Sequence, residues 1–456
     1  MMRISPLAVL VAAVFGALAT LQPVGDSDLF WHLDNGRRTL AGDLPRTDVL
    51  SWTVAGAPVF TDQWLGDVLL AIAKTLGDWR GVLALRVIGV VALVLIVVDT
   101  AMAARPGRPI VAVVAALPAI ALSRFAWTDR PELLGWVCFA LLVRLLRGGD
   151  RALLFTIPLL LVWSQLHGSY ALGLGLILAS CGARAIKNER ERWQYVPIAA
   201  FAFVVTLWTP AGIGTWTAPG FHFFSPPRFI QEWALVDART LPGVLFLGTL
   251  CLLIATGMLG TRTTLRDAAL LIPVAFISLT AARHMPFLAI AAAPYFASRW
   301  PDPLARMRVR DDARPTETLS RRVAGSSLIV AAALAVLAVA VGLADAKIDE
   351  SGYPKGALGA LPSGPGLFNQ YDWGGWLIYA SPKTPTFIDG RLVPFVPGVL
   401  DDYRSIISAR PDWEDVVSRR GVTMMLVRPS DPIATRAPER GWRVAYRDAL
   451  ALVLAK

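Results

Sequence analysis

Residues 81–104 read GVLALRVIGVVALVLIVVDTAMAA, an almost uninterrupted apolar run. A helix needs about 20 apolar residues to cross a hydrocarbon core of about 30 Å, and this run is long enough. Similar runs recur from the N-terminus to about residue 344, and 55% of all residues are apolar while 17% are charged. Such a chain cannot hide its apolar surface in one soluble core, so the sequence predicts an α-helical polytopic membrane protein.

We expect about eleven transmembrane helices from these runs. Their ranges are 6–24, 81–104, 109–123, 132–147, 152–166, 169–183, 195–212, 242–259, 267–282, 285–299 and 323–343. The opening residues 1–20 also resemble a cleavable signal peptide, with Arg3 before an apolar stretch and the tripeptide Ala17-Leu18-Ala19 after it. We expect an uncleaved first span, and under either interpretation the chain from Gly25 onward emerges on the outer side.

When the loops between the predicted spans are assigned alternately to the two sides of the membrane, most of the basic residues fall on one side. The basic residues on this side are Arg3, Arg105, Arg108, Arg144, Arg147, Arg151, Arg184, Lys187, Arg190, Arg192, Arg262, Arg266, Arg299, Arg306, Arg308, Arg310, Arg314 and Arg322. By the positive-inside rule this side is cytoplasmic, so the N-terminus lies inside and the C-terminus outside. Orientation therefore explains the net charge of +10 better than nucleic-acid binding does.

The same charge argument predicts two helical hairpins. The stretches 152–183 and 267–299 each have basic residues at both ends, so both ends should be cytoplasmic. The hairpin tips would be residues 165–169 and 282–286, where Gly168 and Pro286 supply the break.

The predicted outer side holds the long loop 25–80 and a C-terminal domain at 345–456, while residues 1–344 form the membrane bundle with its loop. Strands are expected at 387–389, 422–427 and 442–454 and a helix at 401–419, which together indicate a small α/β domain. All four histidines fall on or near this outer face. They are His32, His167, His222 and His284.

Two carboxylates, Asp26 and Asp28, stand at the outer end of the first span. They could share a divalent cation, or one could act as a general base while the other orients it. The structural alternative is a helix cap, because the residues that follow, Leu29 to Leu33 with His32, predict an amphipathic helix along the membrane interface.

The loop motifs resemble the opening of a group of bacterial membrane proteins assigned to the GT-C glycosyltransferase superfamily. The resemblance rests on residues 26–33, 36–37, 44–48, 51–53 and 64–65, and continues at 163–169 and 283–287. It implies a GT-C fold in a bacterial inner membrane and a polyprenyl-phosphate-linked sugar as donor. It also implies an acidic residue of the first outer loop, here Asp26 or Asp28, as catalytic base or ligand of Mg²⁺ or Mn²⁺.

Such an enzyme needs a base near the acceptor and cations near the leaving phosphate. We expect Asp28 to be the base and Asp26 to orient the acceptor or hold a metal. The candidate phosphate-binding residues are Arg124, Arg130, His167, Arg283 and His284. His32 of the first loop is a further candidate for substrate binding. Arg86 could contact the lipid phosphate or simply snorkel to the interface, and Glu232 could complete the acceptor site or belong to an interfacial turn.

The C-terminal domain carries a second aromatic and acidic motif, residues 371–376 (YDWGGW). It is loosely similar to the WWDYG signature of oligosaccharyltransferases, although its aromatic order differs. Asp372 and Trp373 could contact substrate, or Asp372 could cap a helix.

The sequence therefore indicates a glycosyltransferase that moves a sugar from a membrane-embedded polyprenyl-phosphate donor to a glycan, lipid or protein acceptor. A lipid or polysaccharide transporter is the first alternative, but it should carry ionisable residues at the bilayer midplane, where this chain has almost none. A non-catalytic envelope assembly protein is the second, and its Asp, Arg and His residues would have no reason to converge.

Cysteine-accessibility labelling tests the predicted topology. Single cysteines in place of Asp43 and Asp401 should react with a membrane-impermeant reagent from the same, outer side of the membrane. Labelling of the two positions from opposite sides would refute the parity argument.

Overall fold

The computed structural model describes residues 5–59, 62–124, 127–225, 227, 230–259, 263–300 and 317–456. Several basic residues of the topology argument lie outside this part of the chain: Arg3, Arg262, Arg306, Arg308, Arg310 and Arg314. The chain divides into two compact units. We call Met1–Gln22 with Leu83–Ala346 the helical unit, and Pro23–Val82 with Lys347–Lys456 the mixed unit.

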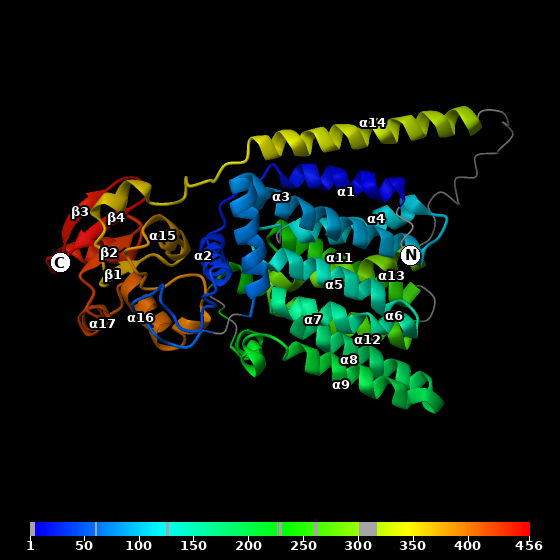
Figure 1. Cartoon of the computed structure of the whole chain (residues 1–456), viewed down its shortest axis with the longest axis horizontal. Helices are drawn as coiled ribbons and strands as arrows, with labels where there is room; N and C mark the ends of the chain where they lie inside the picture. Colours follow the sequence, from blue (N-terminus) through cyan, green and yellow to red (C-terminus); the bar gives the residue numbers. More distant parts are fainter. Residues whose placement is uncertain are drawn as a thin grey trace. The chain divides into compact units, whose positions relative to one another are not determined.

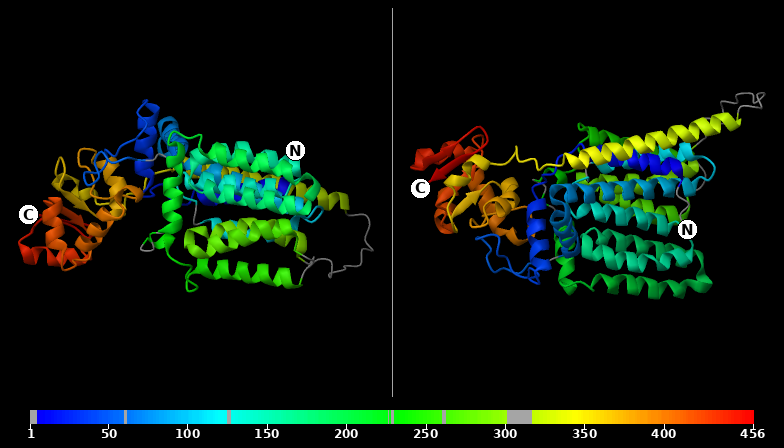
Figure 2. Two further views of the ribbon diagram at one scale, coloured as in Figure 1. Left: turned by 90° about the horizontal axis from the view of Figure 1, so that it is seen from below. Right: turned by 45° about the horizontal axis from the view of Figure 1, so that its top comes forward.

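The helical unit consists mainly of helices, most of which run side by side while α10 lies across the others (Figures 1 and 2). They are α1 (Pro6–Ala19), α3 (Trp64–Ala104, which begins in the mixed unit), α4 (Pro109–Ser123), α5 (Glu132–Leu146), α6 (Asp150–Leu154), α7 (Thr156–Leu166), α8 (Tyr170–Lys187), α9 (Tyr195–Thr206), α10 (Thr217–Phe224), α11 (Leu241–Leu259), α12 (Leu265–Thr280), α13 (Met285–Arg299) and α14 (Glu317–Ala344). Helix α13 is buried along nearly its whole length and packs against α4 and α12, while α1 packs against α14.

Both predicted hairpins are present. Helices α7 and α8 pack against each other and are separated only by residues 167–169, and α12 and α13 are joined through the short 3₁₀ helix η5 (Ala282–His284). Pro286 stands in the first turn of α13, where its missing N–H costs no hydrogen bond. These turns bring His167 and His284 to the same end of the bundle.

Many helices have nearly the bounds that the sequence predicts, α4 and α13 at both ends, but few of them are long enough to be clear membrane spans. Within the described residues, three helices are long and apolar enough to cross a membrane, Trp64–Ala104, Tyr170–Lys187 and Leu241–Met258, and three shorter apolar helices are found. Most of the other described helices have 16 residues or fewer, and a helix of 15 residues is only about 22 Å long. The structure is thus mostly helical and polytopic, but it shows three clear span candidates in place of about eleven.

Helix α3 begins well before the predicted span. It starts at Trp64 and is interrupted at Asp78, whose φ of 53° and ψ of −142° are not helical. Gly81 permits this break, because a Cβ there would lie 1.8 Å from the carbonyl oxygen of Ala73.

The mixed unit contains a four-stranded sheet of order β1-β2-β4-β3, in which β1 and β2 are parallel and the other pairs antiparallel. Its strands are β1 (Leu367–Asn369), β2 (Met424–Val427), β3 (Arg443–Arg447) and β4 (Leu452–Ala455), and its helices are α2 (Leu29–Leu40), α15 (Gly374–Ala380), α16 (Gly398–Ile407), α17 (Trp413–Arg420) and α18 (Pro432–Arg436).

Three local predictions for this unit were wrong. Residues 442–454 form two antiparallel strands, because Asp448 accepts backbone hydrogen bonds at 450 and 451 and turns the chain. The helix expected at 401–419 is two helices, α16 and α17, interrupted at Ala409 with a φ of 48°. Residues 387–389 do not form a strand, because their backbone groups form hydrogen bonds with side chains, including one from the first loop, and not with a neighbouring strand.

The first loop and the C-terminal segment share one hydrophobic core. Phe30 of α2 is buried in the same cluster as Trp373, Trp376, Leu426 and Val453. This grouping differs from the expected division at residue 344, which assigned the loop to the bundle. The loop requires these partners because it has no sheet of its own to cover its apolar side chains.

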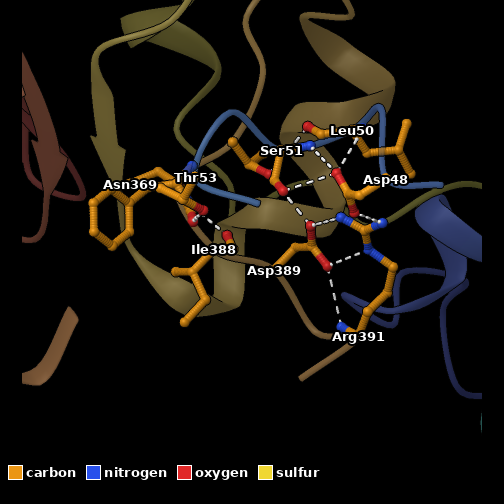
Figure 3. Close-up of polar contacts among 10 residues, drawn as sticks. Asp48, Leu50, Ser51, Thr53, Asn369, Ile388, Asp389 and Arg391 are labelled. Atoms are coloured by element: carbon orange, nitrogen blue, oxygen red, sulfur yellow. Dashed lines mark hydrogen bonds and ion pairs between the residues drawn. The ribbon is translucent and has the colours of Figure 1, made fainter. Parts of the chain in front are cut away.

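A buried ion network also joins the loop to the C-terminal segment (Figure 3). The guanidinium of Arg391 forms ion pairs with Asp48 and with Asp389, and both carboxylates are almost completely buried, at 2% and 0% exposure. Asp48 also accepts hydrogen bonds from the backbone N–H and hydroxyl of Ser51. Beside the network, the backbone N–H of Trp52 donates to the carbonyl of Thr386 at 3.0 Å.

Replacing Arg391 should therefore destabilise the mixed unit. Arg391→Ala leaves two carboxylates buried without a counter-charge, which costs about 3–5 kcal/mol. The unfolding temperature of the purified protein should fall by roughly 10 °C. The control is Arg436→Ala, which breaks an exposed pair with Glu439 and should cost about 0–1 kcal/mol. Equal shifts in the two variants would contradict a structural role for the network.

Candidate active site

Asp26 and Asp28 lie directly before helix α2 in the mixed unit. Asp28 is the residue at its N-terminal boundary, and the backbone N–H of Asp28 donates to Oδ1 of Asp26 at 3.0 Å. Both side chains are half-buried. The Asp26 carboxylate therefore has a local structural role, while no capping hydrogen bond is formed by the Asp28 side chain.

Glycines of the C-terminal motifs hold this segment closely. A Cβ on Gly390 would lie 1.7 Å from Oδ1 of Asp28, and a Cβ on Gly375 would lie 2.0 Å from the carbonyl oxygen of Ser27. Any side chain at these positions would displace the two aspartates. The motifs that contain the glycines thus shape the position of Asp26 and Asp28.

Tyr353 completes this environment. Its hydroxyl donates to the carbonyl oxygen of Gly25 at 2.7 Å. Burial raises the pKa of Tyr353 above its ordinary value, and the negative charges of Asp26 and Asp28 raise it further. The phenol therefore stays protonated beside the two carboxylates.

The other predicted site residues of the mixed unit have structural partners. Trp373 is 1% exposed and donates from Nε1 to the carbonyl of Gly352 at 3.0 Å, whereas Asp372 forms an exposed ion pair with Arg428. His32 is 2% exposed, and its Nδ1 lies 2.5 Å from Oδ1 of the equally buried Asp67. This contact joins α2 to the start of α3.

A second polar cluster lies at one end of the helical unit. Arg283 forms ion pairs with Glu132 and with Glu232, each at 2.8 Å. Arg130 lies 3.1 Å from Glu232 and 3.5 Å from Glu132. Two arginines and two glutamates therefore form a closed network, which we call the Arg–Glu cluster.

Aromatic rings surround the Arg–Glu cluster. The guanidinium of Arg283 lies 4.6 Å from the ring centre of Trp233, on which His222 stacks with 4.5 Å between ring centres. His284 approaches the same tryptophan edge-on at 5.5 Å. Burial lowers the pKa of His222 to about 3, and the positive charge of Arg283 contributes, so this ring is neutral at pH 7.

The hydrogen bonds assign different proton positions to the two hairpin histidines. The backbone N–H of Ser169 donates to Nδ1 of His167 at 3.1 Å, so the proton of neutral His167 sits on Nε2. Nδ1 of His284 lies 3.2 Å from the carbonyl oxygen of Ile277, which can only accept, so His284 carries its proton on Nδ1. His167 is thus a donor at Nε2, and neutral His284 is an acceptor there.

Arg86 and Arg124 lie outside the Arg–Glu cluster. Arg86 is 4% exposed, lies 3.3 Å from Asp129 and donates to the carbonyl of Gln22 at 2.7 Å. Packing within the helical unit therefore accounts for its position, and its contact with a lipid phosphate stays a prediction. Arg124 follows α4 and is exposed.

The helical unit thus brings together five of the predicted site residues. These are Arg130, His167, Glu232, Arg283 and His284. Sequence reasoning missed Glu132, which is 7% exposed at the start of α5. Its signal was available, because a carboxylate at the first position of a span, directly after Arg130 and Pro131, is unusual for a lipid-facing residue.

A divalent cation would find two carboxylates at Asp26 and Asp28. Within the described residues no group of three or more His, Cys, Asp or Glu side chains is arranged to hold a metal. Magnesium is often bound by one or two carboxylates, with waters and substrate phosphate completing its shell. Asp26 and Asp28 are the residues that would hold such a metal together with substrate phosphate.

Substitution of Gly390 tests the contact with Asp28. Gly390→Ala should cost about 1–3 kcal/mol of stability because the new methyl group collides with the carboxylate. In an Asp28→Ala background the same substitution should cost much less, since the colliding atom is gone, and thermal unfolding of the four proteins measures this coupling. Gly359→Ala, where no atom lies within 4 Å of the new Cβ, is the control. Equal costs in both backgrounds would mean that Gly390 does not hold Asp28.

Comparison with known proteins shows a likeness in fold alone. No family model matches the chain, and no curated protein matches its sequence. An oligosaccharyltransferase from Archaeoglobus fulgidus, tethered with an acceptor peptide, superposes with a TM-score of 0.55 at 14% identity, covering 93% of this chain and 69% of that one.

Two further solved structures are similar. AglB from the same archaeon, in complex with an inhibitory peptide and a dolichol-phosphate, gives a TM-score of 0.56 at 13% identity, covering 92% of this chain and 69% of that one. ArnT from Cupriavidus metallidurans gives 0.48 at 14% identity, covering 98% and 97%. Over nearly its whole length, the chain is structurally similar to glycosyltransferases of the GT-C superfamily.

Proposed function

We propose that this protein is a membrane glycosyltransferase that moves a sugar from a polyprenyl-phosphate donor to an acceptor at the extracytoplasmic face, with inversion. The observation that carries the proposal is the Arg–Glu cluster, which lies beside His167 and His284 at one end of a bundle with this fold. Preorganised cations in a partly dry site stabilise a leaving phosphate far better than cations in water. A scaffold protein would have no need for such convergence.

In the proposed reaction, Asp28 takes the proton of the acceptor hydroxyl. The acceptor oxygen then forms a bond to the anomeric carbon on the face opposite the phosphate, and the bond between that carbon and the phosphate oxygen breaks. The polyprenyl phosphate leaves with the electron pair of the broken bond. Arg130 and Arg283 stabilise its charge, and the Nε2–H of His167 donates to it.

The proposal requires the two groups of residues to act on one molecule. A phosphosugar is about 10 Å long on ordinary covalent dimensions, so Asp28 and Arg283 must come within that reach during the reaction. Asp26 and Asp28 would hold a divalent cation, Mg²⁺ or Mn²⁺, if one takes part, and the ion would add positive charge beside the phosphate.

The donor class is supported by the similar archaeal structure that contains a dolichol-phosphate. A long isoprenoid tail stays in the lipid, which suits a protein whose proposed phosphate-binding residues, Arg130 and Arg283, lie at one end of the helical unit. The acceptor is a glycan, a lipid or a protein carrying the attacking hydroxyl.

Asp28→Asn tests the proposed base. The variant nearly preserves shape but removes the basic carboxylate, so transfer of sugar from a polyprenyl-phosphate donor should fall about a hundredfold to ten-thousandfold while expression stays normal. Transfer is measured with purified protein and a radiolabelled donor. Activity near that of the wild type would exclude Asp28 as the base.

Two matched variants of the same loop sharpen the test. Asp43→Asn removes an exposed carboxylate that pairs with Arg38 and should leave transfer unchanged. Asp26→Asn should lose activity, and part of that loss should be recovered at a higher metal concentration if Asp26 is a metal ligand. An equal loss in Asp43→Asn would mean that charge in the loop, and not a base, supports activity.

A further inference from the structure

The carboxylate of Glu232 bridges two arginines in a way that resembles a bound anion. Its Oε1 lies 2.8 Å from Arg283, and its Oε2 lies 3.1 Å from Arg130. Each oxygen therefore serves a different guanidinium. Two non-bridging phosphate oxygens could make the same pair of charge-assisted hydrogen bonds.

The two glutamates of the Arg–Glu cluster are not equivalent. The side chain of Glu132 is 9% exposed and sits on the first turn of α5, where the packing of the bundle fixes it. The side chain of Glu232 is 33% exposed and belongs to a 3₁₀ helix of three residues, η4 (Gln231–Trp233). Glu132 is thus a permanent counter-charge, whereas Glu232 can leave by rotating its own side chain.

The backbone around Glu232 can stay in place during such a rotation. Trp233 is 6% exposed and packed against Arg283, and the backbone N–H of Ala282 donates to the carbonyl of Ala234 at 2.9 Å. These contacts anchor the turn on the side of the arginines. The departure of Glu232 therefore needs no movement of the segment that carries it.

The charge balance indicates which ligand can replace Glu232. Arg130 and Arg283 carry two positive charges, which Glu132 and Glu232 neutralise. The pKa of Glu232 lies below its ordinary value, because the charges of Arg283 and Arg130 outweigh the effect of burial, so the group is an anion at pH 7. A phosphodiester carries one negative charge, and exchange for Glu232 would leave the cluster neutral.

We propose that Glu232 is an internal anion that occupies the donor's phosphate position in the resting protein and is displaced by the single phosphodiester of the incoming lipid-linked sugar. This inference rests on the proposed function and deepens it. A diphosphate-linked donor would bring a second negative charge that the cluster does not balance. After transfer, the returning carboxylate competes with the polyprenyl phosphate product and promotes its release.

Binding of farnesyl methyl phosphate, a short isoprenyl phosphodiester with one negative charge, tests the exchange in the full-length protein in detergent micelles. Glu232→Gln removes the competing anion, so the Kd should fall at least about tenfold, the effect of losing one charged competitor. Glu232→Asp, whose shorter side chain cannot reach both arginines, should give a smaller decrease and serves if the first variant does not fold. Glu189→Gln removes an exposed carboxylate elsewhere in the helical unit and should leave the Kd unchanged.

Arg283→Gln separates this inference from the proposed function. If Arg283→Gln weakens binding while Glu232→Gln binds no more tightly than the wild type, the phosphate site stands and the exchange is wrong. If the wild type does not bind farnesyl methyl phosphate, or if Arg283→Gln binds it equally well, the phosphate site itself is wrong and the exchange falls with it. Tighter binding in Glu232→Gln together with weaker binding in Arg283→Gln is the expected result.

Discussion

The guanidinium of Arg391 lies between two carboxylates that water cannot reach, and the rest of the mixed unit depends on this neutralisation. Asp48 comes from the first loop and Asp389 from the C-terminal segment, so neither segment could bury its acid alone. Gly390 lies between the two C-terminal members of this network and packs against Asp28. The ion network thereby holds the backbone that determines where the proposed base stands.

Paired charges also occur at both ends of the helical unit. At one end the Arg–Glu cluster is closed on itself, and at the other Asp267 contacts Arg147 at 3.3 Å and Arg299 at 2.8 Å. Fixed counter-charges let arginines sit in a poorly hydrated place with their guanidinium groups already oriented. Stabilisation of a leaving phosphate then requires little rearrangement, which is the property that makes preorganised electrostatics effective.

Local patterns in the sequence predicted local structure well. Apolar runs and the charges that flank them were sufficient to predict the two hairpins, because the residues that reverse the chain lie within a few positions of the turn. The sequence argument placed the loops that carry Arg130, Glu232 and Arg283 on the same side of the membrane, which is consistent with their meeting in one cluster. The ends of α4 and α13 match the predicted ranges 109–123 and 285–299, and those of α5 and α12 lie within two residues of them. The start of α3 was less predictable, since this helix begins at Trp64 and continues past an interruption at Asp78.

Contacts between distant segments could not be predicted in the same way. Asp48 and Arg391 are separated by 343 residues, and nothing in the neighbourhood of either marks the other as its partner. An arginine near the end of an apolar run, such as Arg86, is typical of a side chain that snorkels to the interface. Arg86 instead pairs with Asp129 in the interior of the helical unit. Strands β1 and β4 are too short to show an alternating pattern, so their pairing with β2 is determined by tertiary packing.

This separation affects how the protein is made. At a synthesis rate of about 5–20 residues per second, the ribosome needs roughly 20–70 s to proceed from Asp48 to Arg391. During that time the first loop has neither its counter-charge nor the core that covers Phe30. The segment with the proposed base is therefore among the first parts of the chain to be synthesised and among the last to fold, and a nascent chain that stops before the C-terminal segment carries an unfinished loop.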